Sequence, residues 1–243
     1  DNDLGQLGNG MVGAPSGNPI AASGTAGARE LALGPQHSCA RMSERNVMCW
    51  GSNAAGEATG TAGGPVTTPT TVPGVADAST IGAGGRNGTA ESRHTCVTHS
   101  TGGATCWGGN GHGQLGRTLD SPMPAAVEGL ADVVQIALGG EETCASTGAG
   151  ALFCWGRNEQ PGTLGIPLTG MGTDVGTPTE IAVSPLVAAP SVPFAPTLSS
   201  SELWRCFGGA DAAVYCLGQD LDGRLGGAGG TTSTPVMVPV SGV

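Results

Sequence analysis

Short apolar stretches alternate with glycine-rich polar turns along the whole chain. An apolar stretch ending near glycine, such as 29–34 (RELALG) or 133–140 (VVQIALGG), precedes two cysteine-containing stretches that are joined by a polar turn. This pattern predicts three short antiparallel strands per unit. The G-x-L-G tail and later stretches, such as 69–75 (PTTVPGV) and 178–183 (PTEIAV), are expected to supply a fourth, outer segment. No stretch has the 3.6-residue period of a long helix, and none approaches the ~18 apolar residues of a membrane span.

The eight cysteines form four pairs with one C-x9-C spacing: Cys39–Cys49, Cys96–Cys106, Cys144–Cys154 and Cys206–Cys216. Two cysteines at this spacing can face each other across a hairpin, close to disulfide reach. A zinc site would need ligands two to four residues apart within a pair. We therefore predict four disulfides, ahead of zinc ligands or free thiols. Each bridge should contribute about 2–3 kcal/mol, and together they predict an extracellular, cell-surface or periplasmic location.

Aligned on these cysteines, the chain consists of four repeats. The aligned segments are HSCARMSERNVMCWGSN, HTCVTHSTGGATCWGGN, ETCASTGAGALFCWGRN and WRCFGGADAAVYCLGQD. We predict one region over 1–243, with repeats at approximately 23–73, 74–130, 131–183 and 184–243 and with 1–22 as an orphan outer segment of a preceding repeat. Variable repeat lengths around a fixed core are typical of propellers and solenoids. Four short strands per repeat favour an all-β propeller of at least four four-stranded blades.

Residues 132–165 resemble the repeat of the regulator of chromosome condensation family. That repeat has an apolar strand ending in glycine, then His-Thr-x-Ala-Leu, Gly-x-Val-x-x-Trp-Gly-x-Asn and Gly-Gln-Leu-Gly. Here C-W-G-x-N occurs three times and G-Q-L-G twice, at 49–53, 106–110, 154–158, 5–8 and 113–116. The resemblance implies a β-propeller, usually seven-bladed in the family, with protein–protein interaction as its usual role. The cysteine pairs mark a secreted version similar to bacterial extracellular relatives.

Tryptophan and histidine recur at fixed repeat positions. The tryptophans that follow the second cysteine are interpreted as packing between blades rather than as a ligand platform; they are Trp50, Trp107 and Trp155, with Leu217 in the fourth repeat. Two histidines at one repeat position, His37 and His94, are interpreted as structural hydrogen-bonding groups, and Glu142 and Trp204 replace them later. His99 and His112 lie in predicted turns without an evident triad partner.

The carboxylates give only weak candidates for a metal site or a catalytic site. Asp220 and Asp222 faintly resemble a calcium loop, as do Asp1 and Asp3, but more oxygen ligands would be needed. The recurring turn beginning at Asn is the favoured interpretation, so we predict no metal and no cofactor. A polysaccharide-acting enzyme would need converging carboxylates. The candidates for that role are interpreted as solvated strand starts: Glu30, Asp77 and Asp132.

Inserted loops are the best candidates for recognition, because loops vary on a constant scaffold. They are 60–70, 86–92 and 166–178, and Asn87 begins a glycosylation sequon in the second of them. The proline-rich stretch 185–198 is interpreted as an extended linker or a strayed inner strand.

The net charge of the chain limits the kinds of partner that it is expected to bind. All nine basic residues are arginine, and 19 carboxylates give a net charge of −10, which disfavours binding to nucleic acid or to anionic lipid. We predict a secreted or cell-surface non-enzymatic protein-interaction or structural module. Its partner is a protein or another copy of the chain, bound through exposed sheet edges. The alternatives are an inhibitor of a secreted enzyme and, less favoured, a polysaccharide-acting enzyme.

Overall fold

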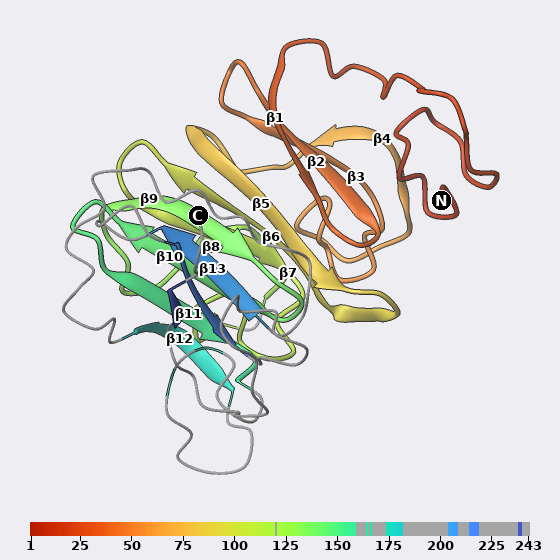
Figure 1. Ribbon diagram of the computed structural model, residues 1–243. Helices are drawn as coiled ribbons and strands as arrows, with labels where there is room; N and C mark the ends of the chain where they lie inside the picture. Colours follow the sequence, from red (N-terminus) through yellow and green to blue (C-terminus); the bar gives the residue numbers. More distant parts are fainter. Residues whose placement is uncertain are drawn as a thin grey trace.

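Four antiparallel sheets follow one another along the chain in the computed structural model (Figure 1). The structure describes residues 1–119, 121–158, 164, 166, 174–181, 204–208, 214–218 and 238–239. Within these ranges the regular secondary structure is entirely β-strand, and no helix is present that could span a membrane. The predicted all-β fold with four-stranded sheets is therefore confirmed, whereas blade number and ring closure stay predictions.

The sheets share one strand order, in which each strand pairs with its neighbour in sequence. The first sheet contains β1 (Ala28–Leu33), β2 (His37–Met42), β3 (Val47–Gly51) and β4 (Val66–Thr71). The second contains β5 (Ala78–Arg86), β6 (Thr89–His99), β7 (Ala104–Gly108) and β8 (Ala125–Ala126). The third contains β9 (Val133–Leu138), β10 (Glu142–Thr147), β11 (Leu152–Gly156) and β12 (Val175–Glu180). The fourth contains β13 (Trp204–Gly208), β14 (Val214–Gly218) and β15 (Val238–Pro239).

The outer segment differs from the sequence-based prediction. The glycine-rich tail after β3 is a turn and not part of a strand: the amide of Gly56 donates to the carbonyl of Asn53 at 3.1 Å. The side chain of Asn53 also accepts from the amides of Ala58 and Thr59. Strand β4 begins earlier than the apolar stretch 69–75, and Val72 lies beyond it in the core. Val72, which the sequence pattern placed in the strand, therefore packs in the core where the chain leaves the sheet.

Cross-strand register gives each sheet two different faces. In the first sheet Ala32 lies opposite Cys39, which lies opposite Cys49, and we call the side that carries such residues the cysteine face. Leu33, Ser38 and Trp50 are likewise in register and lie on the other side, which we call the tryptophan face. The alternation follows from the two-residue period of a strand.

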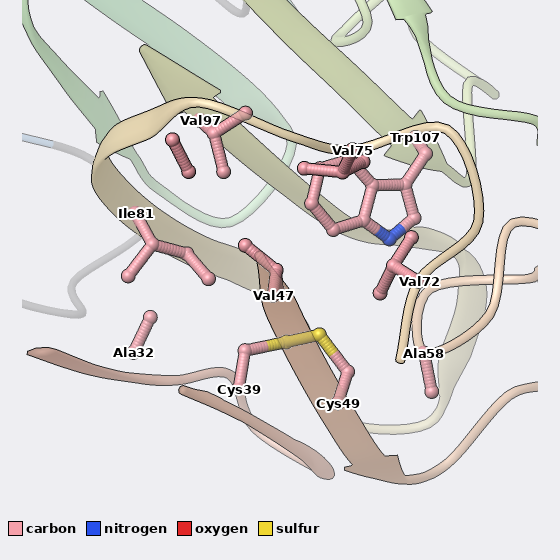
Figure 2. Packing of buried hydrophobic residues seen from close by; sticks show 11 residues of the cluster. Ala32, Cys39, Val47, Cys49, Ala58, Val72, Val75, Ile81, Val97 and Trp107 are labelled. Atoms are coloured by element: carbon pink, nitrogen blue, oxygen red, sulfur yellow. A yellow bond between two sulfur atoms is a disulfide. The ribbon is translucent and has the colours of Figure 1, made fainter. Parts of the chain in front are cut away.

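The core lies between the cysteine face of one sheet and the tryptophan face of the next. Figure 2 shows the first of these junctions, where the Cys39–Cys49 pair packs with Ile81 and Trp107 of the second sheet. At the second junction the Cys96–Cys106 pair of the second sheet packs with residues from the tryptophan face of the third: Ile136, Leu138, Ala145 and Trp155. The sheets therefore stack in one direction.

All four cysteine pairs lie at the predicted positions across β-ladders. Their S–S distances are 2.11, 2.10, 2.03 and 1.99 Å for Cys39–Cys49, Cys96–Cys106, Cys144–Cys154 and Cys206–Cys216. Their Cα atoms are 4.0–4.1 Å apart, because the two cysteines of each pair face each other directly.

The Cys144→Ala/Cys154→Ala double variant is expected to lower the free energy of unfolding by about 2–3 kcal/mol, because the short loop it opens gains conformational entropy in the unfolded chain. Denaturant titration measures the loss. Intact mass of the unreduced protein supplies the control, since four bridges remove about 8 Da. Alkylation of all eight sulfurs without prior reduction would contradict the predicted bridges.

Candidate functional site

The ends of the inner strands of the first three sheets, with the turns that follow them, gather around one pocket. Its volume is about 380 Å³, within the range of pockets that hold small ligands or an anchoring side chain. The lining consists of glycines, apolar residues and the side chains of a hairpin: Leu33, Gly34, Pro35, Ala83, Gly84, Gly85, Arg86, Asn87, Leu138, Gly139 and Gly140. Three equivalent turns therefore build this pocket.

Glycine is required where these turns touch. A Cβ atom on Gly84 would lie 2.5 Å from the carbonyl oxygen of Gly139 and 2.9 Å from Cβ of Leu138. The adjacent amide of Gly85 donates to the same carbonyl at 3.0 Å. Because these glycines have no side chains, the second and third sheets can approach each other closely here. This close approach shapes the pocket.

The expected loop 86–92 is instead the end of a hairpin. Strands β5 and β6 extend until Arg86 pairs with Thr89, and Asn87 and Gly88 form the exposed tip. Gly88 has a φ of 82°, and Asn-Gly is the strongest short-range hairpin signal in a sequence, so this feature could have been predicted. The other two expected loops contain most of β4 and the start of β12, with 167–173 outside the described residues.

A charged cluster of five residues lies behind Arg86. Its centre is Glu141, whose side chain is 2 % exposed. The carboxylate lies 3.2 Å from Nε of Arg86 and 2.5 Å from Nη1 of Arg157. His112 lies between two carboxylates, with Nε2 3.5 Å from Glu141 and Nδ1 3.0 Å from Asp174. Because a buried carboxylate needs charged partners, Glu141 holds both arginines in place.

His112 lies in a turn, as predicted, and it also has two carboxylate partners that the sequence did not indicate. Both of its ring nitrogens face carboxylates that are distant in sequence. A second buried ion pair lies one repeat earlier: Nε of Arg93 is 3.2 Å from Glu57, and Nη1 of Arg93 also contacts Gln36. Gln36, Arg93 and Glu141 hold equivalent places in their repeats, each directly before the residue at the histidine position.

His37 and His94 make structural hydrogen bonds between sheets, as predicted. Nε2 of His37 is 2.9 Å from Oγ1 of Thr95, and Nε2 of His94 is 2.9 Å from Oγ1 of Thr143. Burial lowers the pKa of His37 to about 3 and that of His94 to about 4. The nearby charges of His94 and Arg93 lower the pKa of His37 further. Both rings are therefore neutral near pH 7.

A turn carbonyl completes each junction. The carbonyl of Glu57 accepts from the Thr95 hydroxyl and from the Trp107 indole N–H, both at 3.0 Å. The carbonyl of Gln114 accepts at 2.9 Å from the equivalent residues of the next repeat, Thr143 and Trp155. At the start of the chain Gln6 accepts from Trp50 at 2.8 Å. The turn around Gln6 thus accepts from Trp50 in the same way as the turns at Glu57 and Gln114 accept from Trp107 and Trp155.

The carboxylates considered for catalysis do not converge. Glu30 pairs with Arg41 at 3.0 Å. Asp77 accepts from Arg45 and Ser100 at 2.6 Å each, and the Ser100 hydroxyl and then Arg45 lower its pKa. Asp77 precedes β5, whereas the pocket lies at the other end of that strand.

Asp77 lies at a strand start and is partly exposed, as interpreted, and its bonds to Arg45 and Ser100 also join two turns. Asp132 takes the equivalent position, with a φ of 55° against 62° for Asp77. Asp220, Asp222 and the stretch 185–198 lie outside the described residues. No group of three or more His, Cys, Asp or Glu side chains in the described ranges is placed to hold a metal.

Two stretches of the chain match models of the regulator of chromosome condensation (RCC1) repeat, at 29–57 and 102–146. The chain is 37 % identical over 92 residues to RUG3, a mitochondrial RCC1 domain-containing protein of Arabidopsis thaliana. That similarity covers 36 % of this chain and 20 % of RUG3.

Solved structures share the fold. Human WBSCR16 superposes with a TM-score of 0.77 at 19 % identity, covering 99 % of this chain and 61 % of that protein. Yeast RCC1 (Prp20), bound to Kap60, gives 0.67 at 21 % identity over 88 % of this chain and 50 % of its own. Prp20p of Saccharomyces cerevisiae, whose structure was solved with a study of its binding to Gsp1p and histones, gives 0.65 at 20 % identity, over 89 % of this chain and 52 % of its own. The chain thus spans about three-fifths or less of these proteins.

The predicted extracellular, cell-surface or periplasmic location is wrong. A relative that this chain resembles, RUG3, is a mitochondrial protein. The physical reason is that the cysteine spacing reports which side chains face each other across a ladder, and this register is independent of the surrounding redox potential.

Proposed function

We propose that this chain is a non-enzymatic protein-binding module on an RCC1-like repeat scaffold, and that its partner inserts a side chain into the pocket described above. The observation that carries the proposal is the construction of that pocket from three equivalent turns, with the Asn87–Gly88 tip at its mouth. Two proteins of this fold support a protein partner: yeast RCC1 was solved bound to Kap60, and the structure of Prp20p was solved with a study of its binding to Gsp1p and histones.

The proposed partner is a protein rather than a nucleic acid. With nine arginines against 19 carboxylates, the chain would repel a phosphate backbone. Arg86 and Arg93 beside the pocket are already paired with Glu141 and Glu57. A non-enzymatic role is supported by the separate pairing of Glu30 and Asp77. No described residue favours an inhibitor or a polysaccharide-acting enzyme over this proposal.

Peptides selected from a displayed random library test the pocket. Asn87→Trp is expected to weaken their binding at least tenfold, about 1.4 kcal/mol, because an indole at the hairpin tip covers the pocket mouth. Calorimetry on the full chain measures the dissociation constant. Asn18→Trp is the matched control, since Asn18 is exposed in the N-terminal segment away from the pocket lining. Peptides that bind both variants equally well would contradict the proposed site.

A further inference from the structure

Three Asn-Gly dipeptides occur in the chain, at 9–10, 87–88 and 110–111. This dipeptide is chemically labile, because glycine has no side chain to hinder attack of its own backbone nitrogen on the side-chain amide of the preceding asparagine. The attack requires that nitrogen to be free and the asparagine side chain to rotate toward it. Local hydrogen bonds therefore determine which of three identical dipeptides can react in the folded protein.

The first dipeptide is restrained at both reacting groups. The amide of Gly10 donates to the carbonyl of Thr67 in β4 at 2.9 Å. The side chain of Asn9 is held as well, since its Oδ1 accepts from the amide of Met11 at 3.1 Å. Cyclisation at Asn9 would have to break both hydrogen bonds.

The third dipeptide is restrained in the same way. The amide of Gly111 donates to the carbonyl of Glu91 at 3.3 Å. Oδ1 of Asn110 accepts from the amide of Leu115 at 2.9 Å, which closes the turn after β7. The nitrogen that would attack and the amide that would be attacked are therefore both engaged.

The second dipeptide has neither restraint. Asn87 and Gly88 are exposed at the tip of the β5–β6 hairpin, beyond the pairing of Arg86 with Thr89. Among the described residues, none accepts from the Gly88 amide or bonds to the Asn87 side chain. The space beside Gly88 is also open, since a Cβ atom built there would meet no atom within 4 Å apart from its chain neighbours.

We propose that Asn87 is a site of spontaneous modification, at which the folded protein converts asparagine to aspartate and isoaspartate. The backbone nitrogen of Gly88 attacks Cγ of Asn87 and forms a C–N bond that closes a five-membered succinimide ring. The bond from Cγ to the side-chain nitrogen breaks, and ammonia leaves with the proton from the Gly88 nitrogen. No oxidant or reductant takes part.

Water then opens the ring at one of its two carbonyl carbons. Cleavage of the bond from the Gly88 nitrogen to Cγ gives aspartate with the original backbone. Cleavage of the bond from that nitrogen to the backbone carbonyl carbon of residue 87 gives isoaspartate, in which the chain runs through the former side chain. Either product replaces a neutral amide with a carboxylate.

This carboxylate would stand at the mouth of the pocket, which Asn87 lines together with Arg86. Isoaspartate also adds one carbon to the backbone at the hairpin tip. The charge and shape of the mouth would therefore change with the age of the protein. The inference goes beyond the proposed function, because the reaction needs water and the hairpin but no partner.

Peptide mapping by mass spectrometry tests the inference on the full chain incubated at mildly alkaline pH. Asn87 is expected to convert at least about tenfold faster than Asn9 or Asn110, which corresponds to about 1.4 kcal/mol in activation free energy and to the net strength of one hydrogen bond. The conversion is seen as the mass difference between an amide and an acid, in two products that separate on chromatography.

The reduced and denatured chain is the matched control. All three dipeptides have the same following residue, so their rates should converge once the hydrogen bonds are lost. Asn87→Gln should stop conversion at this position, because glutamine would have to close a less favourable six-membered ring, and should leave the rates at Asn9 and Asn110 unchanged.

Equal rates at the three sites in the folded protein would overturn the inference. So would an unchanged Asn87 after an incubation that converts half of it in the denatured chain. These measurements use no peptide ligand. Failure of the modification is thereby distinguished from failure of the proposed protein-binding site.

Discussion

Replacing Trp107 by leucine is expected to lower the free energy of unfolding by about 3–4 kcal/mol. The indole is fully buried between the first and second sheets. Leucine fills only part of that volume and leaves a cavity. It also removes one of the two donors to the carbonyl of Glu57, so that only Thr95 still donates to this oxygen.

Denaturant titration of three variants tests this expectation. Trp107→Phe keeps an aromatic ring and loses the N–H, so it should cost about 1–2 kcal/mol. Trp50→Leu is the positional control. Trp50 holds the same repeat position, but among the described residues only the N-terminal segment and its own sheet pack against it. Its loss should be clearly smaller than that of Trp107, and an equal loss at both positions would contradict packing between sheets as the source of stability.

Acid is expected to destabilise the fold steeply below pH 6.5. Burial lowers the pKa of His37 from 6.5 to about 3 and that of His94 from 6.5 to about 4. The unfolded chain therefore binds protons that the folded chain excludes. The stabilisation is fully present above pH 6.5 and is lost as the pH falls toward the folded values. Each ring contributes a slope of about 1.4 kcal/mol per pH unit, giving roughly 4 kcal/mol between about pH 6.5 and 4.5.

Unfolding titrations at a series of pH values measure this slope. His37→Gln and His94→Gln should each remove about half of it, whatever their effect on stability at pH 7, and the double variant should remove most of it. The slope is the informative quantity, because glutamine cannot be protonated in this range. A wild-type stability that stays constant from pH 6.5 to about 4.5 would contradict neutral buried histidines.

The scaffold could be predicted from the sequence because its determinants are local and repeated. The C-x9-C spacing places Cys39 opposite Cys49, and the apolar stretch 29–34 becomes an inner strand. Trp107 packs between sheets as its recurrence indicates. The error in the outer segment is also local, because Val72 directly follows β4, where its amide still donates to the carbonyl of Val47 and its side chain packs in the core.

The charged cluster could not be predicted in this way. His112 and Asp174 are 62 residues apart, and Glu141 lies between them in sequence. They come from three different connections between strands, so no fixed spacing in the sequence indicates that they meet. Their proximity depends on how neighbouring sheets pack, which a single-sequence pattern does not specify. The predicted extracellular, cell-surface or periplasmic location was wrong for a similar reason, because strand register does not depend on the cellular compartment.

Both described junctions pack the cysteine face of one sheet on the tryptophan face of the next. This fixed direction has a consequence for how such chains gain or lose repeats. The second sheet offers His94 to the sheet after it and Thr95 to the sheet before it. A tandem duplication of 74–130 would therefore place His94 of one copy beside Thr95 of the next and reproduce a junction that already exists. Stability in such arrays is a sum of nearest-neighbour terms. Gene duplication can thus add or remove a blade without redesigning any contact, and selection can act on blade number separately from the chemistry of each blade.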